Sequence, residues 1–202
     1  MIESKQDLAY YLGQDKIALY IPPKQRAPRP FYDEEWRYEI ILRKLEYVLN
    51  CRTGKLFLPL RLFWKLRLHR YSVKLGIMVP PNVFGPGLSI AHRGTLGANG
   101  SAKIGRNCRI HEGVIIGASN GPEAAVIGDN VFLGTGAKVI GAVTLADNIV
   151  VGAGAVVVKS CLEPGVTLAG NPARIISHND SRDFIAKGLD GAYTGEKGGV
   201  EA

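Results

Sequence analysis

The chain has 202 residues, a net charge of +7 and 25 glycines, with the hydrophobic content of an ordinary globular protein. That length supports one core, or one domain with a small appendage. No apolar run is long enough to span a membrane, and the three cysteines, which lack metal-ligand spacing, favour a reducing, cytoplasmic setting.

The basic excess lies entirely in the first part of the chain. Residues 1–80 contain 15 Lys and Arg against 8 Asp and Glu, whereas residues 81–202 contain 10 of each. Within residues 52–74 there are seven basic residues and no acidic one. This segment is interpreted as a solvated helix edge or as a contact with an anionic membrane surface. We expect no nucleic-acid partner, because no recognition motif accompanies the charge.

Residues 1–76 predict a small helical region. Residues 4–20 read as a helix capped by Ser4, the proline-rich residues 22–30 as a linker, and residues 32–50 as an amphipathic helix with acids in its first turn. In residues 55–76 the leucines alternate as in a strand, but Leu, Lys and Arg favour a helix and Pro59 suits its first turn. We predict a helix that packs on two sides.

From residue 98 the sequence repeats in units of six. The first position is aliphatic, at Ile104, Ile110, Ile116, Ile127, Leu133, Val139, Leu145, Val151 and Val157. The fifth is small or β-branched, at Ala102, Cys108, Val114, Val131, Ala137, Val143, Ile149, Ala155 and Cys161. Such a repeat predicts a parallel β-helix, with three units in each triangular coil of about eighteen residues. Both sets of side chains fill its interior, and Gly, Asn and Asp form its corners.

Two segments depart from the repeat. "GASNGPEAA", residues 117–125, interrupts it and predicts a protruding loop. Residues 180–202 contain few large apolar side chains and are expected to form a mobile tail.

Five runs stand out between the helical region 1–76 and the tail 178–202: "FGPGLSIAHRGT", "AKIGRNCRIHEGVIIG", "IGDNVFLGTGAKVIGAV", "IVVGAGAVVVKS" and "LAGNPARII". Through these runs, which cover residues 77–177, the chain resembles hexapeptide-repeat acyltransferases, and more narrowly the serine acetyltransferase group. This resemblance implies a mainly β fold, a left-handed parallel β-helix, assembled as a homotrimer with acetyl-CoA bound between subunits and no metal.

His92 and His111 are separated by one coil plus one residue. This spacing predicts that both imidazoles point outward at nearly the same corner of adjacent coils. Acetyl transfer to a hydroxyl needs a base, and a histidine with a pKa near 7 suits that task. The resemblance assigns the base to His92 of "AHRGT". His111 is expected to orient the acceptor or share the proton transfer, and Glu112 to orient a histidine.

The resemblance also implies a coenzyme site along the stacked coils, closed by the run "GNPAR". Gly and Ala would offer backbone contacts, and the basic residues would contact the phosphates or adenine. The residues expected at acetyl-CoA are Gly134, Thr135, Gly152, Ala153, Lys159, Asn171, Pro172 and Arg174.

The acceptor site departs from that of serine acetyltransferases. Those enzymes have an aspartate before the active-site histidine, where this chain has Ala91, and an Asp-Arg-His-Pro run where it has "GASNGPEAA". Their helical domain is also longer. We therefore expect a sugar hydroxyl of surface-polysaccharide biosynthesis as acceptor, modified at the inner face of the membrane, with L-serine as the alternative. The expected acceptor contacts are Arg93, Asn99, Ser119 and Asn120.

Two other classes use the same fold. A zinc carbonic anhydrase needs three histidines on adjacent coils, and the coils of this chain offer two. A non-catalytic β-helix scaffold would consume no thioester.

Overall fold

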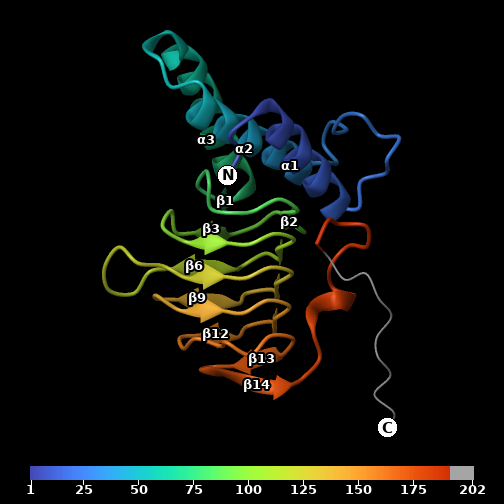
Figure 1. The fold of residues 1–202 in the computed structure, drawn as a ribbon, viewed down its shortest axis with the longest axis vertical. Coiled ribbons are helices and arrows are strands. Elements are labelled where there is room, and N and C mark those ends of the chain that lie inside the picture. The colour runs from blue at the N-terminus through green and yellow to red at the C-terminus, as the bar shows by residue number, and fades with distance from the viewer. Residues whose placement is uncertain (192–202) are drawn as a thin grey trace.

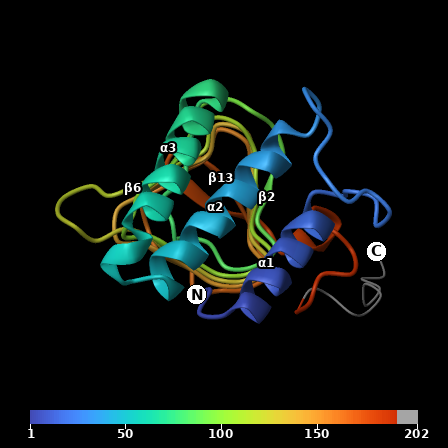
Figure 2. The ribbon, with the colours of Figure 1, turned by 90° about the horizontal axis from the view of Figure 1, so that it is seen from above.

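The computed structural model describes residues 1–191, which form a parallel β-solenoid capped at its N-terminal end by helices (Figure 1). Seen from above, the coils have a triangular outline (Figure 2). The parallel β-helix predicted by the repeat is therefore confirmed.

Each side of the triangle is one sheet. The five-stranded sheet contains β1 (Ile77–Met78), β3 (Leu96–Ala98), β6 (Ile115–Gly117), β9 (Lys138–Ile140) and β12 (Val156–Val157). The three-stranded sheet contains β4 (Lys103–Ile104), β7 (Val126–Ile127) and β10 (Thr144–Leu145). The six-stranded sheet contains β2 (Ser89–Ile90), β5 (Arg109–Ile110), β8 (Phe132–Leu133), β11 (Val150–Val151), β13 (Thr167–Gly170) and β14 (Ala173–Ser177). Every pairing is parallel except that of β13 with β14.

The interior is filled by the first and fifth positions of the repeat. Ile110 and Leu133, at first positions, and Val131, at a fifth, are fully buried. Cys108 and Cys161 are buried in the same core, as their fifth positions predict, and burial raises the pKa of the Cys108 thiol. The alternation of inward and outward side chains therefore matches the pattern in the sequence.

Asparagine forms one corner of three successive coils. Asn107, Asn130 and Asn148 have φ values of 58°, 56° and 63°, in the left-handed region that asparagine tolerates better than most residues. Their side chains also stack: the amide of Asn107 donates to Asn130 at 2.8 Å, and that of Asn130 to Asn148 at 3.0 Å. These side chains join the coils at a corner where no strand does.

The helical region has three helices, as predicted. Helix α1 (Lys5–Ala18) begins after Ser4, whose hydroxyl accepts the Asp7 N–H at 3.0 Å. Helix α2 (Glu34–Cys51) follows the linker, and a short 3₁₀ turn (Lys55–Phe57) leads into α3 (Leu58–Leu75). None of these described helices meets the length and hydropathy needed to cross a bilayer.

Helix α3 packs on one side only. Leu68 and Leu75 are buried against α2 and the first coil, whereas Leu62 and Leu66 are exposed. The prediction that this helix packs on two sides is wrong within the chain, because no described element covers its outer face (Figure 1).

Helix α2 is attached to the first coil by a buried ionic network. The Nε of Arg43 lies 2.7 Å from Asp15 Oδ2, and its Nη1 lies 3.0 Å from Glu46 Oε2. The guanidinium also donates to the carbonyls of Phe84 and Gly85, at 2.9 and 2.6 Å. Burial alone would lower the pKa of Arg43, but the two carboxylates raise it above its usual value, so the group stays charged.

The chain after β14 turns back along the six-stranded sheet to α1 (Figure 1). It includes a 3₁₀ turn (Ser181–Asp183), and Ile185 and Leu189 are buried with Ala18 of α1. The Tyr10 hydroxyl donates to Asp190 at 2.8 Å. The expected mobile tail is therefore wrong for residues 181–190, since a few apolar side chains are enough to dock them. Residues 192–202 lie outside the described part of the chain.

Residues 118–125 form the predicted loop, which protrudes between β6 and β7 (Figure 1). Ala124 and Ala125 are buried where the chain re-enters the coil.

Candidate active site

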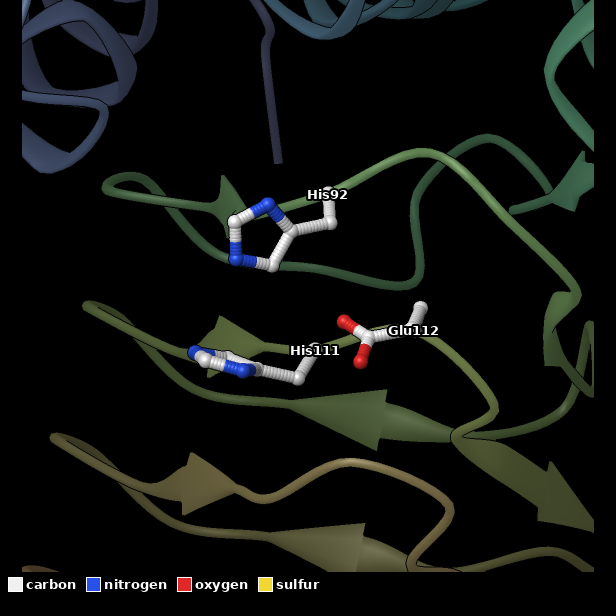
Figure 3. A group of neighbouring side chains, drawn as sticks. All are labelled: His92, His111 and Glu112. Carbon is white, nitrogen blue, oxygen red and sulfur yellow. The ribbon is translucent and has the colours of Figure 1, made fainter.

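His92 and His111 lie on successive coils, in the turns that follow β2 and β5 (Figure 3). Their ring centroids are 5.3 Å apart and their planes are perpendicular. His92 is exposed and His111 is half-buried. The prediction that the two imidazoles meet at one corner is confirmed.

The register of the strands places the two histidines diagonally. Ile90 lies opposite Ile110, so His111 is level with Ala91 and His92 lies one residue further along its turn. His92 is thus level with Glu112, the residue after His111.

The turn that carries His92 is longer than the turn below it. The strands resume with Gly97 opposite Ile115, which leaves two extra residues in the upper turn. Gly94 lies in this turn with φ of 141°, and a Cβ there would lie 3.1 Å from the Cβ of Glu112. Glycine is needed because the longer turn closes directly over the Glu112 side chain.

The surroundings of His111 favour its neutral form. Desolvation lowers its pKa from 6.5, and the charges of Arg109 and His92 lower it further, while Glu112 has the opposite effect. The ring also contacts Phe132 edge to face, at 5.0 Å between centroids. A neutral imidazole can both accept and donate a hydrogen bond, which suits contact with a hydroxyl.

Glu112 is ionised beside the histidines. Hydrogen bonds from its own backbone N–H and from Thr135 lower its pKa. Its Oε2 is buried and has no hydrogen-bond partner among the described residues. One side-chain atom each of Glu112, His92 and His111 lies within 4.8 Å of the others, so the carboxylate lies beside both imidazoles.

Small residues form a column below the histidines. The register places Gly134 and Gly152 level with His111 on the next two coils, and Thr135 and Ala153 level with Glu112. The N–H groups of Gly134 and Gly152 donate to the coils below them, at 2.8 Å each. The N–H groups of the two glycines are therefore already paired within the solenoid. What they provide is a surface without side chains.

The basic residues expected at the coenzyme lie at the far end of the solenoid. Lys159 and Arg174 line a hollow of about 370 Å³ beside the last coil. Asn171 and Pro172 lie in the exposed turn between β13 and β14. Several coils separate this hollow from His92, a span that suits a long ligand.

The expected acceptor residues are not gathered around the histidines of one chain. Asn99 follows β3, and Ser119 and Asn120 follow β6, whereas the histidines precede these strands. The two groups therefore lie at opposite ends of the five-stranded sheet. Arg93 lies beside His92, but its Nε is 3.3 Å from Glu35 of α2, an ion pair that the sequence did not reveal.

An aromatic pair beside His111 was also not predicted. Phe132 stacks on Phe184, with 4.4 Å between ring centroids. Phe132 takes an outward position of the repeat, where a large apolar side chain could have indicated that another segment covers it. That segment is residues 181–190.

Comparisons of the sequence and the fold with known proteins find similarity to serine acetyltransferases. No family model matches the chain. The chain is 35% identical over 117 residues to the chloroplastic serine acetyltransferase 1 of Arabidopsis thaliana, covering 56% of this chain and 37% of that one. The chain spans less than half the length of each curated relative that it matches.

Solved structures extend the likeness to the fold. A serine acetyltransferase of Brucella abortus matches with a TM-score of 0.70 and 25% identity, over 87% of this chain and 71% of that one. Its complex with coenzyme A matches with a TM-score of 0.68 and 26% identity, over 87% and 70%. These matches confirm the resemblance drawn from the repeat, and none of their names indicates a metal.

Proposed function

We propose that this chain transfers the acetyl group of acetyl-CoA to the hydroxyl of a small acceptor, with His92 as the general base. The observation that carries this proposal is the pair of outward imidazoles above a column of small residues. His92 is exposed, so it can reach an acceptor hydroxyl, and the adjacent column leaves room for the pantetheine arm. His111 and Glu112 orient the reacting groups.

In this mechanism His92 accepts the proton of the acceptor hydroxyl as its oxygen attacks the thioester carbonyl. The tetrahedral intermediate then expels the thiolate of coenzyme A, which takes that proton from His92 and so restores the base. Thr135 and Ala153 lie next to the column, and Lys159 and Arg174 bind the phosphates or adenine at the far end. Asn171 and Pro172 shape the turn beside that hollow. No metal is required.

The comparisons favour L-serine as the acceptor over the sugar hydroxyl that the sequence alone favours. Every relative and solved structure reported above is a serine acetyltransferase. A sugar hydroxyl remains the second candidate on one observation. The cation next to the base, Arg93, is already paired with Glu35, and residues 118–125 contain no other cation for the serine carboxylate.

An acceptor screen tests the activity. Purified protein is given acetyl-CoA with serine, free sugars, nucleotide sugars or polysaccharide, and thiol release and the mass of the product are followed. We expect acetylation of serine first. If no acceptor gives thiol release above hydrolysis, the proposed function is wrong, and turnover of a glycan alone would promote the second candidate.

We propose further that the chain acts as a homotrimer. Asn99, Ser119 and Asn120 lie away from the histidines of their own chain. In a trimer, residues 118–125 of a neighbouring protomer could lie beside these histidines. An active monomer in light scattering at micromolar concentration would contradict this.

The outer face of α3 is proposed to contact an anionic membrane surface from the cytoplasmic side. Four apolar side chains line this face, with exposed fractions of 62, 55, 53 and 72%: Leu58, Leu62, Leu66 and Val73. Lys65 and Arg70 lie on either side of the stripe, and residues 52–74 contain no acid. An apolar stripe between cations is the pattern of helices that lie in the headgroup region.

A further inference from the structure

The first coil ends the solenoid, and the N–H groups on its upper edge have no coil to pair with. In β2 and directly after it, the N–H groups of Ser89 and Ala91 donate down to the carbonyls of Cys108 and Ile110 of the next coil. The N–H groups of Leu88 and Ile90 face the other way. Because a buried N–H without a partner is costly, this edge needs acceptors from another part of the chain.

Carboxylates of the helices supply these acceptors. Asp15 of α1 accepts the Leu88 N–H at 2.9 Å, and Glu39 of α2 accepts the Ile90 N–H at 2.9 Å. Side chains from α1 and α2 thus take the place of a missing strand.

The same helix continues this contact past the histidine. Glu35 lies one turn before Glu39 on the same face of α2. It accepts the Arg93 N–H at 3.1 Å, and the Nε of Arg93 lies 3.3 Å from the same oxygen. The two glutamates therefore hold the backbone on both sides of His92.

We infer that Glu35 and Glu39 are positioning residues for His92, which fix the backbone that carries the base through the N–H groups of Ile90 and Arg93. This inference rests on the proposed function, in which His92 removes the acceptor proton. A base must be held close to its productive geometry, and a displacement of about 1 Å can cost about 100-fold in rate.

The surroundings of Glu39 fit a role that depends on the acceptor oxygen rather than on charge. Glu39 is fully buried, and its Oε2 has no hydrogen-bond partner among residues 1–191. Burial, followed by the charge of Asp15, raises its pKa well above the usual range, against the effects of the Ile90 N–H and Arg43. A neutral amide could therefore replace this carboxyl group, whereas an apolar side chain could not.

Three variants and a matched control test the inference. Glu39→Leu and Glu35→Ala each remove one acceptor, and Glu39→Gln keeps it. Glu34→Gln is the control: Glu34 lies on the same helix and pairs with Lys74 at 2.8 Å, so the substitution removes a neighbouring carboxylate. No hydrogen bond from Glu34 to residues 90–93 is present in the described structure.

We expect kcat to fall about 10- to 100-fold in Glu39→Leu and Glu35→Ala. The KM for acetyl-CoA should change less than twofold, because the coenzyme site lies on other coils. Glu39→Gln should recover most of kcat, and the control should lose little. A loss of kcat in Glu39→Leu no greater than in the control, or no recovery in Glu39→Gln, would overturn the inference.

A second readout does not depend on activity. Amide hydrogen exchange at Ile90 and Arg93 should speed up at least tenfold in Glu39→Leu and Glu35→Ala, and stay unchanged in the control. Exchange unaltered in both variants would overturn the inference even if kcat fell. If the wild type transfers no acetyl group to any acceptor, the proposed function fails, while the exchange rates still show whether the glutamates hold this segment.

Discussion

The imidazole of His92 meets that of His111 edge to face, with 5.3 Å between ring centroids, although the strand register places His111 beside Ala91. The two rings differ in their surroundings. His92 is exposed, whereas His111 is half-buried against Phe132. In the proposed mechanism this difference divides the chemical tasks: the exposed ring takes a proton from the acceptor, and the shielded ring orients the acceptor.

Replacing His92 with alanine should abolish acetyl transfer and spare coenzyme binding. Loss of a general base typically lowers the rate by about 10²- to 10⁴-fold. The column of small residues proposed for the coenzyme begins two coils below His92, so the Kd for acetyl-CoA measured by calorimetry should stay within about twofold. A variant that keeps more than about a tenth of wild-type turnover would show that His92 is not the base.

His111 should titrate below 6.5 in an NMR titration of its imidazole. Desolvation is the main cause, and Arg109 and His92 add to it. In His92→Ala one of the lowering charges is gone, so the pKa of His111 should rise. In Glu112→Gln the opposing negative charge is gone, so it should fall further. A shift in the opposite direction in either variant would contradict the described surroundings.

Arg43→Met should destabilise the fold by about 3–5 kcal/mol, because it leaves Asp15 and Glu46 buried without a counter-charge. The surface variant Arg106→Met, which breaks an exposed pair with Asp129, should cost about 1 kcal/mol or less. Chemical denaturation measures both.

The loss of stability in Arg43→Met should also depend on pH. Burial already raises the pKa of Asp15 in the folded state, and removal of Arg43 raises it further. The folded variant then binds a proton that the unfolded chain does not, so its stability falls as pH rises and recovers as pH falls toward the unfolded value near 3.8. A difference in unfolding free energy between the wild type and Arg43→Met that is larger at pH 5 than at pH 8 would contradict this reasoning.

The α3 surface should bind vesicles of anionic lipid. We expect co-sedimentation with vesicles containing phosphatidylglycerol, weaker binding at high salt, and little binding to pure phosphatidylcholine. Leu62→Ser with Leu66→Ser should abolish it, whereas Val126→Ser, at an exposed apolar position on the solenoid, should not. Binding equal in the double variant and the control would assign the stripe to another partner, such as a second copy of this chain.

The sequence alone was sufficient to predict the solenoid, because the core of the solenoid is formed by residues that lie close together in the chain. An aliphatic residue such as Leu133 occupies the first position of each unit, and each strand pairs with strands of the coils directly above and below it. Local spacing therefore predicts both the buried positions and the meeting of His92 with His111.

Only the tertiary structure decided the contacts between segments far apart in the sequence. The pairing of Glu39 with Ile90, and of Glu35 with Arg93, depends on how α2 lies across the open end of the first coil, which no period encodes. The docking of Ile185 on Ala18 was missed because so few apolar residues are involved. Local periodicity determined the framework of this protein, whereas the surroundings of its candidate base were decided by packing between a helix and a coil, where complementary shape and unpaired N–H groups determine the arrangement.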